Sequence, residues 1–398
     1  MTLNGEVLVS GMGCICGAGL NLPACMKTLF SGIRRPSLPK AFSILPPAPP
    51  VFEVPGPFFD ANRFGTAFTA RVPQLTLTAT AEALYDAGLA DDDLRQTRVG
   101  VCLGTNVACS INDTPVAEDL HDSDKVSLAG AGRFLRNSPT VAVVEAFSLN
   151  GPTQTTVNAC SAGTDAIGIS AAWIAAGLCD VVISGGVDAL YLVSYLGFRS
   201  LMISDHQPCR PFDRDRAGLN LGEGAAVMIL ERAEHLRARG KSARASILGY
   251  GASADAHHLT MPDPSGRGLI LAIEQALVAG RLSAEDIAFI NAHGTGTTDN
   301  DMIESRVYEK LFPRTPFFST KGYTGHTLGA AGAIEAVFTA ACLKRGQIPR
   351  SAGFETPDPG LKRHPVTAIT DVQGPAALTQ TLAFGGNNAV LVIGQEVS

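Results

Sequence analysis

The stretch LGEGAAVMIL at residues 221–230 aligns without a gap on FGGNNAVLVI at residues 384–393. In both copies glycines lead into a run of branched apolar residues, which is typical of a buried β-strand. A second pair repeats the pattern, because VLVSGMGC at 7–14 resembles SILGYGAS at 246–253. The repetition predicts two similar halves, which we place at residues 1–240 and 241–398.

Strand-like runs alternate with alanine-rich helical patterns along the whole chain. The runs are EVLVSG, VGVCLG, VVISGG, AAVMILE, ASILGYG, AFINAHG and AVLVIG. This alternation predicts an α/β protein whose sheets are covered by helices on both faces. The proline-rich segment at 36–57 is predicted to be a surface loop, since proline disfavours helix and central strand.

Composition excludes several classes of protein. Of 398 residues, 45% are hydrophobic and 17% charged, which is typical of a compact globular chain. A net charge of -6 argues against general nucleic-acid binding. No secretory leader and no apolar run of bilayer length are recognised, so we expect a cytoplasmic protein without a membrane span. The nine cysteines show no paired metal spacing, and neither a disulfide nor a metal site is expected.

Cys160 stands where the strand-like run TQTTV gives way to the small-residue helix SAGTDAIGISAAWIAAGL. Small residues at 161–163 allow a sharp turn and close approach of a ligand. A thiol at the start of a helix also lies at the positive end of the helix dipole, which favours the thiolate. Cys160 is therefore a candidate nucleophile, although free cysteine is also a common core residue.

Two histidines occupy comparable corners in the second half. His293 lies in NAHGTGTTDNDMIE at 291–304, after a strand-like run, and His326 lies in STKGYTGHTLGAAG at 319–332, five residues after Lys321. The segment around His326 precedes a second small-residue helix, as the segment around Cys160 precedes the first. Each histidine alone could be a structural residue. One cysteine and two histidines at the corners of related halves indicate a site for nucleophilic catalysis.

This series of motifs resembles that of the β-ketoacyl-acyl-carrier-protein synthases of the elongating Cys-His-His type. The resemblance rests on NACSAG, NAHGTGT, STKGYTGHTLGAAGAIEA and AFGGNNA, together with RPFDRDRAGLNLGEGAAVMILE at 210–231. It implies a thiolase-like duplicated α/β fold, layered α-β-α-β-α with two mixed five-stranded sheets. It also implies an acyltransferase that condenses an acyl group on Cys160 with malonyl on an acyl carrier protein, extending a fatty-acid, polyene or polyketide chain by two carbons.

The resemblance assigns catalytic roles to several side chains of these motifs. Cys160 is the nucleophile, and His293 and His326 stabilise the enolate left by loss of CO2. Lys321 orients the histidine site through its charge, with Glu304 as its partner. The alternative is that Lys321 is an exposed lysine and Glu304 an ordinary helix-face glutamate.

Further implied roles concern binding of the substrate. The backbone N–H groups of Cys160 and Phe384 form the oxyanion hole, and the Phe384 side chain gates the acyl group. Thr295 and Thr297 bind the phosphopantetheine arm of the carrier protein, which brings the substrates without any resident cofactor. Core packing of Phe384 and simple turn formation by the threonines are the alternatives.

The implied partners are an acyl carrier protein and a second subunit, either an identical chain or a related ketosynthase-like chain. Because carrier proteins are acidic, docking should use basic side chains, and the candidates are Arg63, Arg71, Arg199 and Arg210. These arginines could also be ordinary surface charges. The other functional reading is a partner subunit that controls chain length, but such subunits typically lose the nucleophile.

Three departures from the family pattern surround the expected site. Asn158 replaces the commoner Thr before Ala-Cys, Asn387 replaces a Thr of the glycine-rich loop, and Thr298 stands where proline is common. None removes a catalytic group. They leave the acyl-chain length and type open.

Overall fold

The computed structural model describes residues 7–66, 68, 70–106 and 138–395. The strands are β1 (Val7–Cys16), β2 (Val99–Gly104), β3 (Thr153–Thr156), β4 (Val181–Asp188), β5 (Gly224–Arg232), β6 (Ala245–Ala254), β7 (Ile287–Asn291), β8 (Phe317–Phe318), β9 (Gln347–Ile348), β10 (Thr370–Asp371), β11 (Ala376–Ala383) and β12 (Asn387–Gly394). The helices are α1 (Leu22–Ser31), α2 (Ala61–Phe64), α3 (Arg71–Ala87), α4 (Asp91–Arg95), α7 (Pro139–Phe147), α8 (Ala162–Ala175), α9 (Leu192–Ser200), α10 (Ala233–Ala238), α11 (Arg267–Gly280), α12 (Thr298–Leu311), α13 (Lys321–Thr324) and α14 (Ala331–Arg345).

The main sheet shows the predicted duplication. Its strand order is β3-β2-β4-β5-β1-β6-β12-β11-β7-β8, so each half contributes five consecutive strands, arranged in mirrored order. β5 and β12 begin at Gly224 and Asn387, which are equivalent positions in the sequence repeat. β11, whose polar residues obscure the strand pattern, completes the second half.

The two predicted five-stranded sheets are joined into one ten-stranded sheet. β1 and β6 meet at the centre and pair only at Leu8 with Ser246 and at Val9 with Ala245. Within each half the pairing is mixed. β2 is parallel to β3 and β4, as β7 is parallel to β8 and β11, whereas the strands nearer the centre pair antiparallel.

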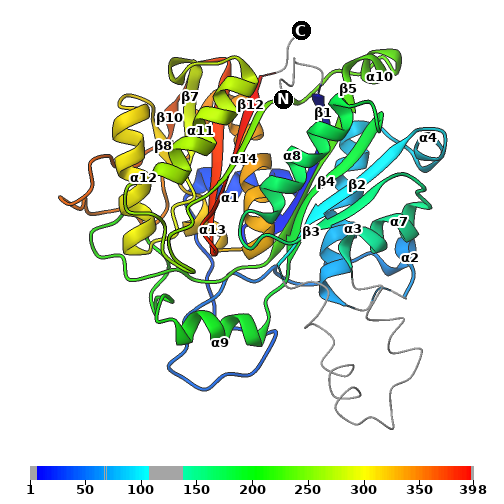
Figure 1. Ribbon diagram of the computed structural model, residues 1–398. Coiled ribbons are helices and arrows are strands. Elements are labelled where there is room, and N and C mark those ends of the chain that lie inside the picture. Colours follow the sequence, from blue (N-terminus) through cyan, green and yellow to red (C-terminus); the bar gives the residue numbers. More distant parts are fainter. Residues whose placement is uncertain (1–6, 67, 69, 107–137, 396–398) are drawn as a thin grey trace.

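Helices cover the sheet in layers (Figure 1). α8 and α14 pack against each other and against strands of both halves, and so form the central layer. α3 covers β1 and β5 on one outer face, and α11 covers β6 and β12 on the other. This arrangement is the predicted α-β-α-β-α layering, and the segment 36–57 carries no helix, as predicted.

The central helices approach each other so closely that glycine is required at their crossing. A Cβ atom added to Gly163 on α8 would lie 2.8 Å from the Gly329 carbonyl oxygen. One added to Gly332 on α14 would lie 1.9 Å from Thr164 Oγ1. Any larger residue would push the helices apart. The helix starts, which carry the candidate site, are therefore held in a fixed relation.

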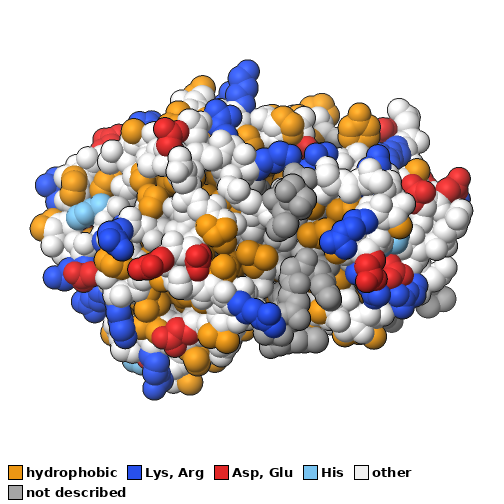
Figure 2. All heavy atoms as spheres, turned by 90° about the horizontal axis from the view of Figure 1, so that it is seen from above, with side chains coloured by type: hydrophobic (Ala, Val, Ile, Leu, Met, Phe, Trp, Pro, Cys, Tyr) orange, Lys and Arg blue, Asp and Glu red, His pale blue; other side chains and the backbone are white. Residues whose placement is uncertain are grey.

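Among the described residues, no helix combines the length and apolar character needed to cross a bilayer. Figure 2 shows basic and acidic side chains interspersed on the face seen from above the view of Figure 1.

Candidate active site

A cavity of about 820 Å³, including its open mouth, lies where several strands end. Six of the candidate catalytic and binding residues line it, namely Cys160, His293, Thr295, Thr297, His326 and Phe384, and so does Asn387. His293, His326 and Phe384 follow β7, β8 and β11, which run parallel to one another, whereas Cys160 follows β3, which runs in the opposite direction. The carboxyl ends of these three strands meet at one edge of the sheet, and Cys160 is brought to the same cavity by α8, which packs against α14.

Cys160 lies on a strained turn at the entrance to α8. The preceding residue, Ala159, has φ of 47°, in the left-handed region that residues with a Cβ atom rarely adopt. The backbone N–H groups of Ser161 and Ala162 bond back to the carbonyl oxygens of Asn158 and Ala159. This local strain fixes the direction of the Cys160 side chain.

A buried carboxylate holds this turn in place. Asp165, one turn into α8, accepts hydrogen bonds from Asn158 Nδ2 at 2.6 Å, Ser161 Oγ at 2.8 Å and the Tyr250 hydroxyl at 2.7 Å. Asn158, which departs from the family pattern, thus takes part in the clamp. Tyr250 lies on β6, so the second half of the molecule supports the nucleophile's turn.

The electrostatic state of Cys160 differs from the sequence-based expectation of a thiolate. Burial raises the pKa of its thiol to about 12, although the charge of Lys321 and a backbone hydrogen bond from Phe384 both act to lower it. Desolvation disfavours the charged sulfur more strongly than these groups favour it. The free protein therefore holds a neutral thiol, and the Phe384 backbone is already directed at the sulfur.

His293 and His326 face each other beside the cavity, with ring centroids 5.3 Å apart and ring planes at 84°. The Leu328 backbone N–H donates to His326 Nδ1 at 3.1 Å. Lys321 Nζ lies 3.1 Å from His293 Nδ1 and acts as the donor, because an ammonium has no acceptor. Both Nδ1 atoms are acceptors, so each neutral ring carries its proton on Nε2.

The neutral state of both rings has a clear physical cause. Burial lowers the pKa of each histidine well below its ordinary value, and the positive charge of Lys321 lowers both further. The site consequently offers two Nε2–H donors without a histidine cation. Such a pair can stabilise negative charge that develops on a substrate oxygen.

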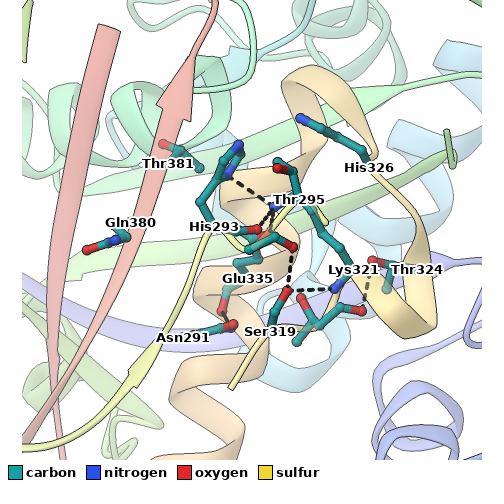
Figure 3. Close-up of polar contacts among 12 residues, drawn as sticks. Asn291, His293, Thr295, Ser319, Lys321, Thr324, His326, Glu335, Gln380 and Thr381 are labelled. Carbon is teal, nitrogen blue, oxygen red and sulfur yellow. Dashed lines mark hydrogen bonds and ion pairs between the residues drawn. The ribbon is translucent and has the colours of Figure 1, made fainter. Parts of the chain in front are cut away.

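Lys321 is the buried cation of the site (Figure 3), with 1% of its side chain exposed. Its Nζ donates to the His293 carbonyl oxygen at 2.6 Å and pairs with Glu335 Oε1 at 2.5 Å. The expected partnership of Lys321 with Glu304 is therefore wrong. Glu335 on α14 reaches the Lys321 ammonium. Glu304 on α12 instead accepts hydrogen bonds from the backbone that follows β7.

Glu304 instead fastens the backbone around His293. It accepts the N–H groups of His293 at 2.8 Å and Gly294 at 2.6 Å. Its remaining donors are side chains, from Asn300, Tyr308 and Gln380. These five donors satisfy both carboxylate oxygens, which explains why a buried glutamate is tolerated there. Glu304 therefore positions the histidine rather than the lysine.

Phe384 and the two threonines shape the mouth of the cavity. Phe384 precedes a turn in which Gly385 and Gly386 have φ of 86° and 78°, and its ring stacks on Phe198 of α9 at 5.5 Å. The hydroxyls of Thr295 and Thr297 lie 2.8 Å apart. The gating and phosphopantetheine-binding roles stay predictions, and the positions suit them.

The four candidate docking arginines differ in their surroundings. Arg63 and Arg199 are exposed. Arg71 forms a two-point ion pair with buried Glu223, and Arg210 lies 3.6 Å from Asp205 Oδ2. The docking role stays a prediction for all four arginines: Arg63 and Arg199 are exposed, whereas Arg71 and Arg210 keep 35% and 30% of their side chains exposed beside an acidic partner.

Two functional carboxylates escaped the sequence reasoning, namely Asp165 and Glu335. Each is the sole acidic residue of a small-residue helix, α8 or α14. A single acidic residue near the start of a helix of small and apolar residues is the signal that could have found both, since charged groups are buried only when paired.

Comparison with known proteins gives a consistent result. The model for the beta-ketoacyl synthase N-terminal domain matches residues 4–235, and that for the C-terminal domain matches residues 244–355. A mitochondrial 3-oxoacyl-(acyl-carrier-protein) synthase from Arabidopsis thaliana is 33% identical over 357 residues, covering 85% of this chain and 77% of the relative. The 3-oxoacyl-(acyl-carrier-protein) synthase 2 of Staphylococcus aureus is 33% identical and covers 81% of each chain. Among solved structures, the ishigamide ketosynthase/chain length factor superposes with a TM-score of 0.89 at 29% identity, over 98% of this chain and 99% of the other.

Proposed function

Because the chain belongs to the β-ketoacyl synthase family, we propose that it condenses an acyl group held on Cys160 with a malonyl group carried by an acyl carrier protein. The reaction releases CO2 and forms a β-ketoacyl chain two carbons longer. The observation that carries the proposal is the convergence of Cys160 with two neutral histidines whose Nε2–H groups serve one cavity.

The first step transfers the acyl group. Cys160 Sγ attacks the thioester carbonyl, the carbon–sulfur bond to the phosphopantetheine arm breaks, and the proton of Cys160 leaves with the released thiol. Negative charge on the carbonyl oxygen is stabilised by the backbone N–H groups of Cys160 and Phe384. One such donor contributes about 2.7–4 kcal/mol to the transition state.

The second step breaks the carbon–carbon bond of the malonyl thioester. CO2 departs and leaves its electron pair as an enolate, whose oxygen accepts hydrogen bonds from Nε2 of His293 and His326. Lys321 supports this step from a distance, because its charge keeps both rings neutral and its ammonium fixes the His293 tautomer. The reaction draws on no resident metal or cofactor.

The third step joins the two fragments. The enolate carbon attacks the acyl carbonyl on Cys160, the Cys160 sulfur departs, and its thiol is restored by a proton. Burial, which raises the pKa of Cys160 to about 12, makes the free thiolate unfavourable, so the departing sulfur takes up a proton from solvent.

The proposed partners follow from the substrates and the relatives. The carrier protein delivers both thioesters through its phosphopantetheine arm, past Thr295 and Thr297. A second subunit, identical or ketosynthase-like, completes the assembly, as in the ketosynthase/chain length factor that this chain resembles. A cytoplasmic location accords with the eight buried free cysteines of the described residues.

The alternative of a subunit that only controls chain length is not favoured. Such a subunit has no need for Cys160, His293, Lys321 and His326 to be assembled around a cavity with the correct tautomers.

The test is the intact mass of the protein after incubation with a panel of acyl carrier-protein thioesters. We expect an acyl-sized mass gain on the wild type and none on Cys160→Ala. Malonyl carrier protein is then added, and the β-ketoacyl product is measured. Labelling that persists in Cys160→Ala, or an acylated wild type that yields no product, would refute the mechanism.

A further inference from the structure

A second chemical cluster lies outside the cavity, at the start of the first half. The sulfur atoms of Cys14, Cys16 and Cys25 all lie within 4.8 Å of one another, and the Cys16 and Cys25 sulfurs are 3.6 Å apart. All three side chains are completely buried. Cys14 and Cys16 share one face of β1, and Cys25 reaches them from α1.

A hydrogen-bonded turn joins the strand and the helix that carry the three cysteines. Cys16 and Gly19 exchange two backbone hydrogen bonds, of 2.9 and 3.0 Å, which close a tight turn between β1 and α1. The Cys25 thiol donates to the Gly19 carbonyl oxygen at 3.4 Å, so the same turn also contacts the third cysteine.

A carboxylate on a neighbouring helix holds both ends of the same unit. Glu82 of α3 accepts the N–H of Cys14 at 2.9 Å and the N–H of Leu22 at 2.8 Å. It thereby fixes the strand that carries two thiols relative to the helix that carries the third. In metal sites generally, hydrogen bonds from outside the ligand shell hold the ligands in their orientation.

The spacing of the sulfurs suits ligands around one ion. With a metal–sulfur distance of about 2.3 Å, two ligands at the tetrahedral angle lie about 3.8 Å apart. The 3.6 Å separation of Cys16 and Cys25 is near that edge and far from the roughly 2.05 Å of a disulfide. A third thiol converging on the same point is not needed for a disulfide or for core packing.

We propose that Cys14, Cys16 and Cys25 bind one thiophilic d10 cation, with Zn²⁺ as the favoured occupant. Binding forms three metal–sulfur bonds and releases the three thiol protons to solvent. Zn²⁺ leaves one net negative charge on three thiolates, whereas Cu⁺ leaves two, and burial penalises the larger charge. The ion ties β1 to α1 and has a structural role, separate from the condensation reaction.

The first experiment measures the metal content of the full-length protein. Protein is purified under reducing conditions, equilibrated in turn with Zn²⁺ and Cu⁺, and freed of loose metal by a competing chelator before elemental mass spectrometry. We expect one equivalent of bound metal in the wild type. In Cys16→Ala it should fall by more than about tenfold, a loss at least as large as removal of an outer-shell partner causes.

Cys342→Ala is the matched control, because Cys342 is equally buried but lies on α14, outside the cluster. It should retain the metal. The Zn²⁺ and Cu⁺ arms identify the preferred ion. No retained metal in either arm, or equal metal in the wild type and Cys16→Ala, would overturn the proposal.

X-ray absorption spectroscopy of the metal-loaded wild type provides a test that does not depend on the folding of a variant. We expect at least three sulfur neighbours at about 2.3 Å. Fewer than three sulfurs would refute the three-cysteine site. So would a mass two hydrogens lower in the metal-free protein with a Cys16–Cys25 linkage in its peptide map, since that result would identify a disulfide pair.

Discussion

The corner that carries Cys160 and the corner that carries Lys321 and His326 are built on the same plan but use it differently. Each has a residue with positive φ before a small-residue helix, Ala159 at 47° and Leu328 at 51°. Each helix also places one buried carboxylate near its start, Asp165 on α8 and Glu335 on α14.

The partners of the two carboxylates make the difference. Asp165 binds neutral donors and so holds a turn, whereas Glu335 binds the Lys321 ammonium and so takes part in setting the charge around His293. A duplicated scaffold thus provides equivalent positions for two different tasks, mechanical support of a nucleophile and electrostatic support of two hydrogen-bond donors. The two tasks should be separable by mutation.

The largest effect is expected from Cys160→Ala. Acyl transfer should fall by about 10⁴- to 10⁶-fold, as for other nucleophiles that act in a unit with their partners. Decarboxylation of malonyl carrier protein should continue, because both histidines and Lys321 are untouched. The measurement is the release of labelled CO2 alongside intact mass. Loss of both steps would show that the two corners do not act separately.

Lys321→Met should have the opposite selectivity. Decarboxylation should fall by about 10²- to 10³-fold, the effect of losing a preorganised hydrogen-bonding group in a transition state. Acylation of Cys160 should fall much less. Glu335→Gln is the control, since it keeps an oxygen acceptor for Lys321 and removes only the negative charge. A Glu335→Gln variant as inactive as Lys321→Met would contradict the separate role of the ammonium.

The pH profile provides a finer test of the histidine corner. Burial and Lys321 lower the pKa of both histidines, so wild-type decarboxylation should not decline as the pH falls through 6.5, the ordinary imidazole value. Removal of the Lys321 charge raises both pKa values, and the acidic limb of Lys321→Met should move to higher pH. Rates of CO2 release between mildly acidic and neutral pH measure this shift. An unchanged limb would mean that Lys321 does not set the protonation state.

Asp165→Asn addresses the nucleophile's corner. It replaces an acceptor-only carboxylate by an amide, leaving one of three donors without a suitable partner. The free energy of unfolding should fall by about 1–3 kcal/mol, and acylation should slow while decarboxylation is retained. Tyr250→Phe, which removes a single donor, should cost only about 0.5–1.5 kcal/mol. Denaturant titration measures both, and equal losses in the two variants would argue against the clamp.

The smallest effect is expected at the mouth. Thr297→Ala removes one hydroxyl from the predicted phosphopantetheine path, so KM for the carrier-borne substrate should rise by about 2–10-fold with kcat unchanged. Steady-state kinetics decide the point. A fall in kcat with constant KM would assign Thr297 to the chemistry instead.

The sequence was most informative where residue type and position agree. Cys160, His293, Lys321 and His326 were predicted because reactive side chains follow strands or precede small-residue helices. Their duplicated setting predicted two similar halves, and the resemblance to the β-ketoacyl synthases implied the layers of the fold. The identity of the Lys321 partner was not predictable, because Glu304 and Glu335 both lie on nearby helices and only the crossing of α14 decides between them.

Other features depend on contacts that a linear pattern does not encode. β11 reads as AALTQTLA, and its polar residues obscure the buried strand that the fold makes of it. The junction of the two sheets rests on two residue pairs between β1 and β6. The cysteine cluster was missed because its third sulfur comes from a helix after an intervening turn, which conceals the spacing that usually marks a metal site.

The place of β1 has a consequence for synthesis of the protein. β1 begins at Val7, yet both of its partner strands come much later in the chain. Val7 lies opposite Arg232 of β5, and β6 follows β5. At the usual rate of about 5–20 residues per second, a ribosome takes roughly 10–45 seconds between making β1 and making the partner of Val7. During that interval the apolar segment that forms β1, with its two cysteines, is synthesised but has no partner strand to pair with. The nascent chain is therefore the stage at which chaperones, oxidants and metal ions have access to Cys14 and Cys16, before the sheet closes over them.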